Sequence, residues 1–332
     1  MKQLTIPISK PFGLLWMLAA ILFIAAVALY LKESEYWWEV VLPAVIVSQV
    51  LIIMSWQDAK YGTIANIIIL IAAFIYVNIL FFEKSFKNDV NKNLLVNNSM
   101  PAGILPEADI QPLPAPVKRY LHYVGAVNKP KLKNMRTVFN VQMRGKGKEF
   151  ANYTSEQYNF FGEPTRLFFM KGKMFGLTVS GYHRFAEGAA TMDIRLLGLV
   201  KVVNISGEVL NKTETVTLFN DMCFMAPATL IDKRINWREI DSNSAGATFT
   251  NHGISVTATL FFNEEGQLID FASNDRTEVT EMKQLPFTTP VSGYKNINGV
   301  VIWTNGEAVW EYPDEKFTYG KFILKEIKYN YN

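Results

Sequence analysis

The polar side chains best suited to chemistry lie between residues 182 and 195. Same-face residues of neighbouring strands lie next to one another, so this stretch could assemble one polar site if it forms strands. Arginine guanidinium groups would then hold a phosphate or a carboxylate through paired hydrogen bonds. The alternative is a solvated sheet edge with ordinary cross-strand ion pairs. The residues are Tyr182, His183, Arg184, Asp193 and Arg195.

No motif for catalysis or for metal binding accompanies this group. The histidines, His122, His183 and His252, make no pair at the spacing of metal ligands. The single cysteine, Cys223, has no second cysteine for a disulfide or a zinc site. The sequence also lacks the G-x-S-x-G and G-x-x-x-x-G-K-[ST] motifs of hydrolases and nucleotide-binding proteins. We therefore predict no catalytic residue, no metal and no cofactor.

Aromatic side chains are concentrated in the segments that alternate in hydrophobicity. If the sheet curves, rings on its concave face could line a cavity for an apolar ligand; otherwise they fill an ordinary core. The rings in question are Phe160, Phe161, Phe168, Phe169, Phe175, Phe261, Phe262 and Trp303. Trp237 is either a packing anchor or a contact. The predicted ligand-binding set is Tyr182, Arg184, Arg195, Phe168, Phe175, Trp237 and Trp303.

Strands must position these residues, because hydrophobic side chains recur with a period of two after residue 138. Most of the predicted strands are separated by Gly, Pro or Asn, which are typical of turns. Their ranges are 138–143, 149–161, 166–171, 173–180, 190–196, 201–207, 255–262, 267–273, 300–312 and 317–330.

Two helices are predicted among the strands. Residues 113–125 carry apolar side chains at helical spacing and end at Gly125, and residues 213–225 have Leu218, Met222 and Met225 four and three residues apart. Strands without a regular strand–helix alternation predict an antiparallel sheet. We expect an α+β domain with a predominantly antiparallel, curved sheet and one or two helices.

Three apolar segments precede this domain and predict a transmembrane helix bundle. The helices are expected at about 12–31, 37–56 and 63–82, and the first has twenty residues without a charge, enough to span the ~30 Å hydrocarbon core. The first segment exceeds the usual apolar length of a signal peptide and lacks a cleavage pattern, so we expect it to be retained. The short connections predict antiparallel neighbours.

Polar side chains occur within the second and third apolar segments. Ser48, Gln49, Asn66 and Asn78 form either a small intramembrane polar site or hydrogen bonds that join the helices. Lysines flank both sides of the three segments in nearly equal number, but the first helix usually sets the orientation, and its lysine-bearing leader predicts a cytoplasmic N-terminus. We therefore expect an integral protein of the bacterial inner membrane with its large domain outside the cytoplasm.

The domain organisation follows from these segments. Residues 1–82 are the predicted transmembrane region, residues 83–105, rich in Asn and Lys, a juxtamembrane linker, and residues 106–332 a β-rich extramembrane domain.

The segment LPAPVKRYL, residues 113–121, resembles an uncharacterised bacterial family in which a domain of unknown function follows one or more membrane helices. Further similarity lies in residues 221–230 with Pro227, in Trp237 with Asp241, and in Gly299, although Met225 stands where the family usually has tryptophan. The resemblance implies no known activity. A helix-backed antiparallel half-barrel is also similar to the fold of periplasmic lipoprotein carriers, which hold acyl chains in a hydrophobic cavity.

The charge balance and the fold define the function hypotheses. With 33 basic and 30 acidic residues, the chain has no electrostatic footprint for nucleic acid. The leading hypothesis is a membrane-anchored binding module for a hydrophobic or lipid-like ligand, with membrane lipids as partners. The alternatives are a membrane-surface enzyme that uses the cluster from Tyr182 to Arg195, and a structural or interaction domain.

Overall fold

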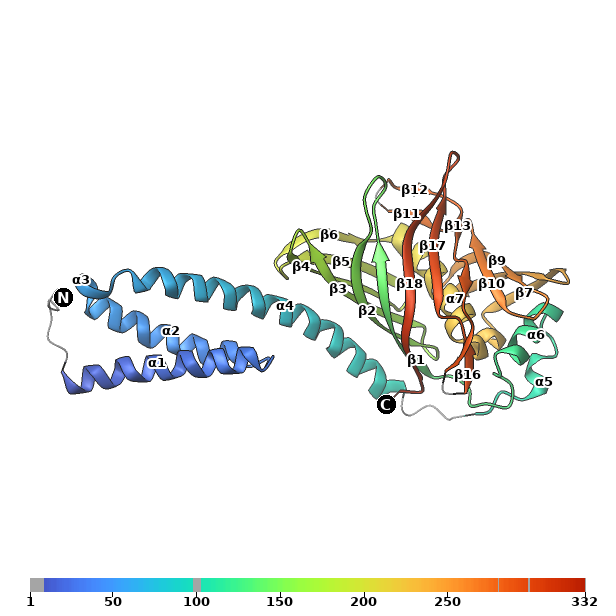
Figure 1. Cartoon of the computed structure of the whole chain (residues 1–332). Coiled ribbons are helices and arrows are strands. Elements are labelled where there is room, and N and C mark those ends of the chain that lie inside the picture. Colours follow the sequence, from blue (N-terminus) through green and yellow to red (C-terminus); the bar gives the residue numbers. More distant parts are fainter. Residues whose placement is uncertain (1–8, 98–102, 280, 298, 332) are drawn as a thin grey trace. The chain divides into compact units, whose positions relative to one another are not determined.

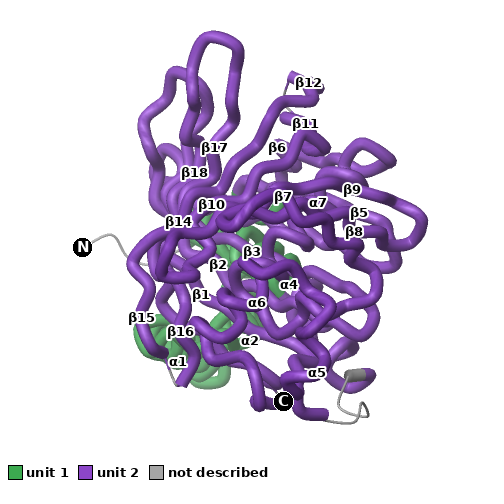
Figure 2. The backbone as a smooth tube through the Cα atoms, turned by 90° about the vertical axis from the view of Figure 1, so that its right-hand side faces the viewer, with its two compact units in different colours: residues 1–83, 197–199 green, residues 84–196, 200–332 purple. Residues whose placement is uncertain are grey.

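The chain folds into two compact units in the computed structural model, which describes residues 9–97, 103–279, 281–297 and 299–331. One unit comprises residues 1–83 with 197–199, and the other comprises residues 84–196 with 200–332 (Figure 2). The first contains apolar helices and the second contains the sheet (Figure 1).

Among the described residues, three helices are long and apolar enough to cross a membrane. They are α1 (Lys10–Leu31), α2 (Trp37–Met54) and α4 (Gly62–Asn97), and the short helix α3 (Trp56–Ala59) precedes α4. Apolar side chains lie all around α1 and α2, as in helices whose solvent is lipid.

The polar side chains of α2 and α4 bond to one another. The Asn66 side-chain amide donates hydrogen bonds to Ser48 Oγ (3.2 Å) and Gln49 Oε1 (3.0 Å), and Gln49 Nε2 donates one to Thr63 Oγ1 (3.1 Å). Asn78 instead bonds to the Phe74 carbonyl within its own helix. The first group therefore joins the helices, which was one of the two interpretations of these residues.

Helix α4 is longer than its apolar segment. Its 36 residues span roughly 54 Å and continue through the first part of the predicted linker to Asn97. The reason is a buried stripe at i, i+4 spacing, Phe86, Val90 and Leu94, within an otherwise polar sequence. Phe86 packs on the sheet, with its ring centroid 5.2 Å from that of Phe169. Residues 98–102 of the predicted linker lie outside the described residues.

One large antiparallel sheet dominates the second unit. Its order is β6-β5-β4-β3-β2-β1-β18-β17-β13-β10-β9-β8-β7, with β14 paired to β17, so it is curved but not closed and β6 and β7 are its edges (Figure 1). The strands are β1 (Asn134–Met143), β2 (Ala151–Phe160), β3 (Thr165–Met174), β4 (Leu177–Ala186), β5 (Ala189–Leu196), β6 (Val200–Ser206), β7 (Ile235–Asp241), β8 (Ser244–Asn251), β9 (Ile254–Phe262), β10 (Leu268–Ser273), β13 (Phe287–Thr288), β14 (Val291–Ser292), β17 (Asn305–Glu311) and β18 (Lys316–Tyr329).

Two small hairpins stand apart from this sheet. They are β11 (Thr277–Glu278) with β12 (Lys283–Gln284), and β15 (Lys295–Ile297) with β16 (Val300–Ile302). The predicted strand 300–312 is therefore two strands, β16 and β17, separated by Trp303 and Thr304.

Helix α7 (Glu208–Met225) connects the two open edges of the sheet. The chain leaves β6, passes through α7 and the 3₁₀ helix η1 (Pro227–Ile231), and enters β7 at the opposite edge. Because α7 packs against both halves of the sheet, it is buried on nearly all sides, including Val216, Leu218 and Phe219. The core of the unit lies between α7 and the concave face.

The helices α5 (Glu107–Ile110) and α6 (Ala115–Tyr123) precede the sheet. Val117, Tyr120 and Leu121 of the LPAPVKRYL segment are buried, and the Tyr120 hydroxyl donates a hydrogen bond to the Cys223 carbonyl (3.0 Å). The last carbonyls of a helix have no partner within it, so Tyr120 satisfies one at the end of α7. The predicted fold class, three apolar helices followed by a curved antiparallel sheet with helices, is confirmed.

Candidate functional site

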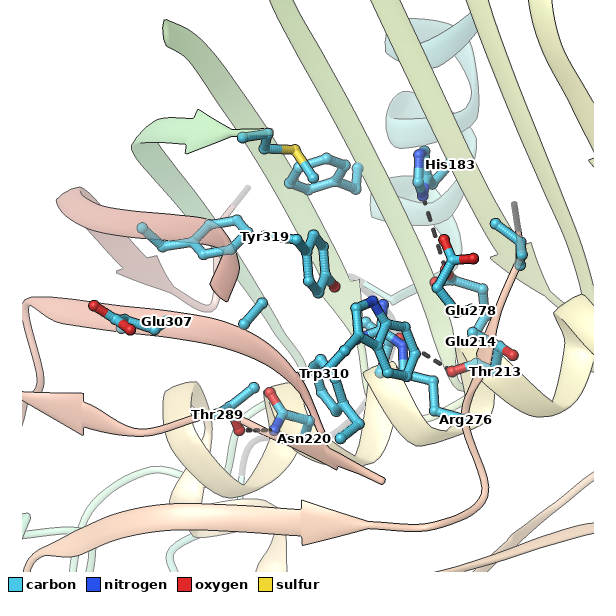
Figure 3. A pocket seen from close by; sticks show the side chains of 18 of the residues that line it. His183, Thr213, Glu214, Asn220, Arg276, Glu278, Thr289, Glu307, Trp310 and Tyr319 are labelled. Atoms are coloured by element: carbon cyan, nitrogen blue, oxygen red, sulfur yellow. Dashed lines mark hydrogen bonds and ion pairs between the residues drawn. The ribbon is translucent and has the colours of Figure 1, made fainter. Parts of the chain in front are cut away.

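A cavity of about 410 Å³ lies between the concave face of the sheet and α7 (Figure 3). That volume is within the ~300–1,000 Å³ range of ordinary ligand pockets. Most of its wall is apolar, and alternate residues of the strands provide it, because only every second side chain of a strand faces inward. The apolar lining includes Phe139, Phe168, Met170, Met192, Ile194, Phe224, Met225, Trp303, Trp310 and Phe322.

One end of the cavity is charged and buried. Arg166 of β3 donates from Nε to Asp221 Oδ2 (2.8 Å) and from Nη1 to Glu214 Oε2 (3.1 Å). Its Nη2 donates to Gln157 Oε1 (3.1 Å). Glu214 and Asp221 are seven residues apart on α7, two helical turns, so both carboxylates lie on the same side of the helix. One guanidinium group therefore holds two carboxylates away from solvent.

Neighbouring side chains complete the hydrogen bonding of Asp221. Gln157 Nε2 (2.7 Å) and Asn159 Nδ2 (3.0 Å), both on β2, donate to the same oxygen, Oδ2, that accepts from Arg166. A buried charge is tolerated only when such partners replace water. The network therefore fixes α7 against the strands at this end of the cavity.

The environment moves the pKa values of the two carboxyl groups in opposite directions. Burial opposes ionisation of Glu214, but the nearby His183 and the Arg166 charge outweigh it and lower the pKa of Glu214 to about 2. Burial is the larger effect at Asp221 and raises its pKa, against the attraction of Arg166. His183 Nδ1 lies 3.8 Å from Glu214 Oε1, the pair joined by a dashed line in Figure 3.

Two buried donors of the cavity wall have no hydrogen-bond partner among the described residues. They are Arg276 Nε and the indole nitrogen of Trp303. The Arg276 guanidinium lies over the ring of Phe287 (4.0 Å to the centroid) and near Trp310 (5.3 Å), so its position is set by aromatic packing. An unsatisfied buried donor costs about 1–3 kcal/mol, which an acceptor on a bound molecule would recover.

The hairpin formed by β11 and β12 contributes to the cavity wall and is held to α7. Thr277 donates its backbone N–H to Thr213 Oγ1 (3.1 Å), and Lys212 Nζ donates to Asp275 Oδ1 (2.6 Å). Glu278 and Glu281 of this hairpin also line the cavity.

The structure separates the predicted polar cluster between the two faces of the sheet. His183 faces the cavity, whereas Tyr182 and Arg184 lie on the opposite, convex face beside Asp89 of α4. The Tyr182 hydroxyl donates to Asp89 Oδ2 (2.7 Å), and Arg184 Nε is 3.4 Å from the same oxygen. Asp193 pairs with Tyr182 across the strands and binds Arg195 (2.7 Å).

The predicted aromatic contacts are distributed more widely. Phe168 and Trp303 line the cavity. Trp237 is half-buried and donates its indole N–H to the Leu230 carbonyl (3.1 Å). Phe175 is exposed in the turn between β3 and β4.

Sequence reasoning missed the residues of the charged end, Gln157, Arg166, Glu214 and Asp221. One local signal existed, because Glu214 and Asp221 lie two turns apart in a helix that is otherwise mostly apolar or hydroxyl-bearing. An acidic pair on a buried helix requires a cationic partner. The sequence does not show that this partner is Arg166.

Comparisons with known proteins give a family and no activity. No curated protein matches the chain at a significant level. Among solved structures, a LolA superfamily protein from Nitrosomonas europaea is similar at 8% identity, with 64% of this chain and 92% of that chain covered and a TM-score of 0.34. That score supports no inference about function. A model of a family of unknown function, DUF6544, matches residues 103–322, about two thirds of the chain, and this protein therefore belongs to that family.

Proposed function

We propose that this chain is an integral membrane protein whose sheet domain binds one amphiphilic, lipid-like molecule in the cavity between the concave face and α7. The observation that carries the proposal is the composition of the cavity, a mostly apolar wall that also contains a buried charged network and two unpaired donors. A ligand with an apolar chain and a polar group would complement both parts.

The apolar part of the ligand would pack against the inward side chains of β1, β3 and β5. Phe139, Phe168 and Met192 represent these strands in the wall. Each methylene group removed from water there contributes about 0.8 kcal/mol. Of the ligand-binding residues predicted from the sequence, we propose that Phe168 and Trp303 contact this ligand.

The polar part would accept hydrogen bonds. Arg276 Nε and the Trp303 indole nitrogen are donors with different neighbours in the wall, so the matching group at either one is a carbonyl, carboxylate or phosphate oxygen. The carboxylates Glu214 and Asp221 are already held by Arg166. These two carboxylates therefore contribute to the polar part of the wall, and Arg276 Nε and the Trp303 indole nitrogen remain available to bind the ligand.

The proposed organisation keeps a membrane region at residues 1–82, and to the ligand-binding domain predicted from residue 106 it adds the part of α4 after Lys84. Three helices that could span a membrane support the first part. The lysines near the N-terminus favour a cytoplasmic start, which after three crossings places the large domain outside the cytoplasm of a bacterial inner membrane.

A cavity-filling substitution tests the binding site. Met192 lines the cavity from β5, whereas the adjacent Thr191 faces the other side of the sheet and is exposed. In titrations of the amphipol-solubilised full-length protein with a dansyl-labelled fatty acid, Met192→Trp should raise Kd at least tenfold because the new ring occupies ligand space. Thr191→Trp is the matched control and should leave Kd unchanged. Equal affinity for both variants would reject the cavity as the site.

A catalytic use of the same cavity is the second candidate function. The observation that favours it is the pair Glu214 and Asp221, whose pKa values move apart beside His183, as in acid–base pairs of enzymes. A binding protein returns its ligand chemically unchanged. If the wild-type protein converts the bound molecule into a product and the Glu214→Gln variant does not, the protein is instead an enzyme.

A further inference from the structure

The turn between β3 and β4 presents a phenylalanine to solvent. Phe175 is 96% exposed, and its neighbours Met174 and Leu177 are also exposed large apolar residues. Such a group on one hairpin is unusual, because most large apolar side chains of the unit lie in its core. Neither packing within the described domain nor burial explains a phenylalanine here.

The backbone of the turn does not favour phenylalanine either. Phe175 has φ 52° and Gly176 φ 80°, so both central residues are in the left-handed region. Two-residue turns of this kind favour Asn or Asp followed by Gly, and a bulky residue at positive φ is strained. The turn between β4 and β5, at the other end of β4, has the same conformation with Glu187 (φ 55°) and Gly188 (φ 73°). The comparison shows that an exposed polar residue satisfies this backbone geometry.

Exposed apolar residues of β6 lie at the same end of the sheet. Val200 pairs with Leu196 of β5, and Leu196 pairs with Val179 of β4, which places the start of β6 near the start of β4. Val200 and Val202 are both exposed. We call Met174, Phe175, Leu177, Val200 and Val202 the apolar tip.

The two segments that form the apolar tip carry only positive charges. Residues 170–179 and 200–203 include Lys171, Lys173 and Lys201 and no acidic residue. Of these, Lys173 and Lys201 are exposed, and exposed lysines near exposed apolar side chains match a membrane surface with anionic headgroups. The apolar groups would enter the acyl boundary while the two lysines stay at headgroup level. A protein partner with an apolar surface would not by itself account for the exposed lysines, Lys173 and Lys201.

We propose that the apolar tip inserts into the surface of an anionic lipid bilayer. The inference rests on the membrane anchoring of the proposed function, because the sheet unit begins at Lys84, directly after the apolar part of α4. A short covalent tether gives the tip a high effective concentration at the bilayer. Weak insertion by a few apolar side chains is therefore sufficient, and it would hold the domain at the surface from which a lipid-like ligand comes.

The test uses full-length protein in vesicles of phosphatidylglycerol and phosphatidylcholine at 3:7. The variant Phe175→Cys is labelled with bimane, and Glu187→Cys, in the matching turn at the other end of β4, is the control. The native Cys223 is fully buried, and unsubstituted protein measures its background labelling. Bimane at 175 should shift to shorter wavelength and lose at least half of its emission when lipids carry a bromine-labelled acyl chain, and bimane at 187 should not change.

A second pair of measurements separates this inference from the proposed function. With Lys173→Glu and Lys201→Glu together, the quenching at 175 should fall at least twofold. Equal quenching at 175 and 187 would overturn the proposal. A blue shift at 175 that persists in detergent without lipid would also overturn it, because the probe would then lie against protein. Flotation of the protein with the vesicles at alkaline pH reports the anchor separately, so a protein that floats without quenching at 175 refutes only the tip.

Discussion

Arg166 holds two buried carboxylates of the cavity wall, because it is the cation shared by Glu214 and Asp221. All three side chains are buried, and Gln157 and Asn159 donate further hydrogen bonds to the Asp221 carboxylate. A buried ion network contributes little net stability compared with apolar packing, but loss of one partner leaves charges without compensation. The network therefore acts mainly to fix where α7 lies and how polar this end of the cavity is.

Removal of Arg166 should destabilise the sheet unit strongly. Arg166→Met leaves two buried carboxyl groups without their cation and should lower the free energy of unfolding by roughly 3–5 kcal/mol. Arg195→Met is the control, because Arg195 pairs with Asp193 in a partly exposed site and should cost about 1 kcal/mol or less. Urea titration of the solubilised full-length protein, followed by tryptophan fluorescence, gives both values. Equal losses would contradict the role assigned to Arg166.

The lowered pKa of Glu214 predicts a dependence of stability on pH. A carboxyl group whose pKa is lower in the folded than in the unfolded chain stabilises the fold above its unfolded pKa. For Glu214 this contribution, on the order of 3 kcal/mol, is lost as pH falls from about 4.5 to about 2. The raised pKa of Asp221 has the opposite sign, since its ionisation costs stability as pH rises through that pKa.

The variant Glu214→Gln isolates the contribution of Glu214. The stability advantage of the wild type over this variant should be largest near pH 6 and should shrink steadily between pH 4.5 and pH 2. Urea titrations at several pH values measure the difference. A difference that stays constant over this range would show that Glu214 does not have a lowered pKa in the folded protein.

At the scale of elements, α4 shows why a polar composition can conceal a helix. The sequence after Glu83 is rich in Asn and Lys, and this composition led to the prediction of a linker. The i, i+4 spacing of Phe86, Val90 and Leu94 was the better signal, because all three are buried. The part of α4 after Lys84 is thus an element of the sheet unit.

Loss of the Phe86 side chain should release this part of α4. The Phe86 ring contacts those of Tyr158, Phe169 and Tyr182, so Phe86→Ala should cost about 3–5 kcal/mol of packing. Hydrogen exchange of residues 84–97 should accelerate at least tenfold as a result. Leu95→Ala, at an exposed position of the same helix, should leave exchange unchanged. Exchange as slow in Phe86→Ala as in the wild type would show that the packing is not needed.

The sequence predicted the elements better than the site. Alternation located β2, β5, β9, β10 and β18 within a few residues, because each of these strands has one inward face and one outward face. The charged network was not predictable, since Arg166 is 48 residues from Glu214 and 55 from Asp221. The same alternation that revealed the strands also separates His183 from Tyr182 and Arg184, adjacent residues that cannot share one face.

At the scale of the whole molecule, the path of the chain produces the cavity. An open sheet would expose its concave face, but the connection from β6 to β7 carries α7 along that face and encloses the cavity. Among the residues that the structure describes, three helices able to span a membrane lie N-terminal to the sheet. The membrane helices and the cavity together support the account of a membrane-anchored protein that binds a lipid-like ligand.

Native mass spectrometry of the full-length protein tests that account most directly. The protein is delipidated, exposed again to a bacterial lipid extract and transferred to the gas phase. The account predicts one additional mass per chain, of unchanged lipid, that is present in Thr191→Trp and absent from Met192→Trp. A wild-type protein that takes up no mass, or a bound mass that Met192→Trp retains, would contradict it.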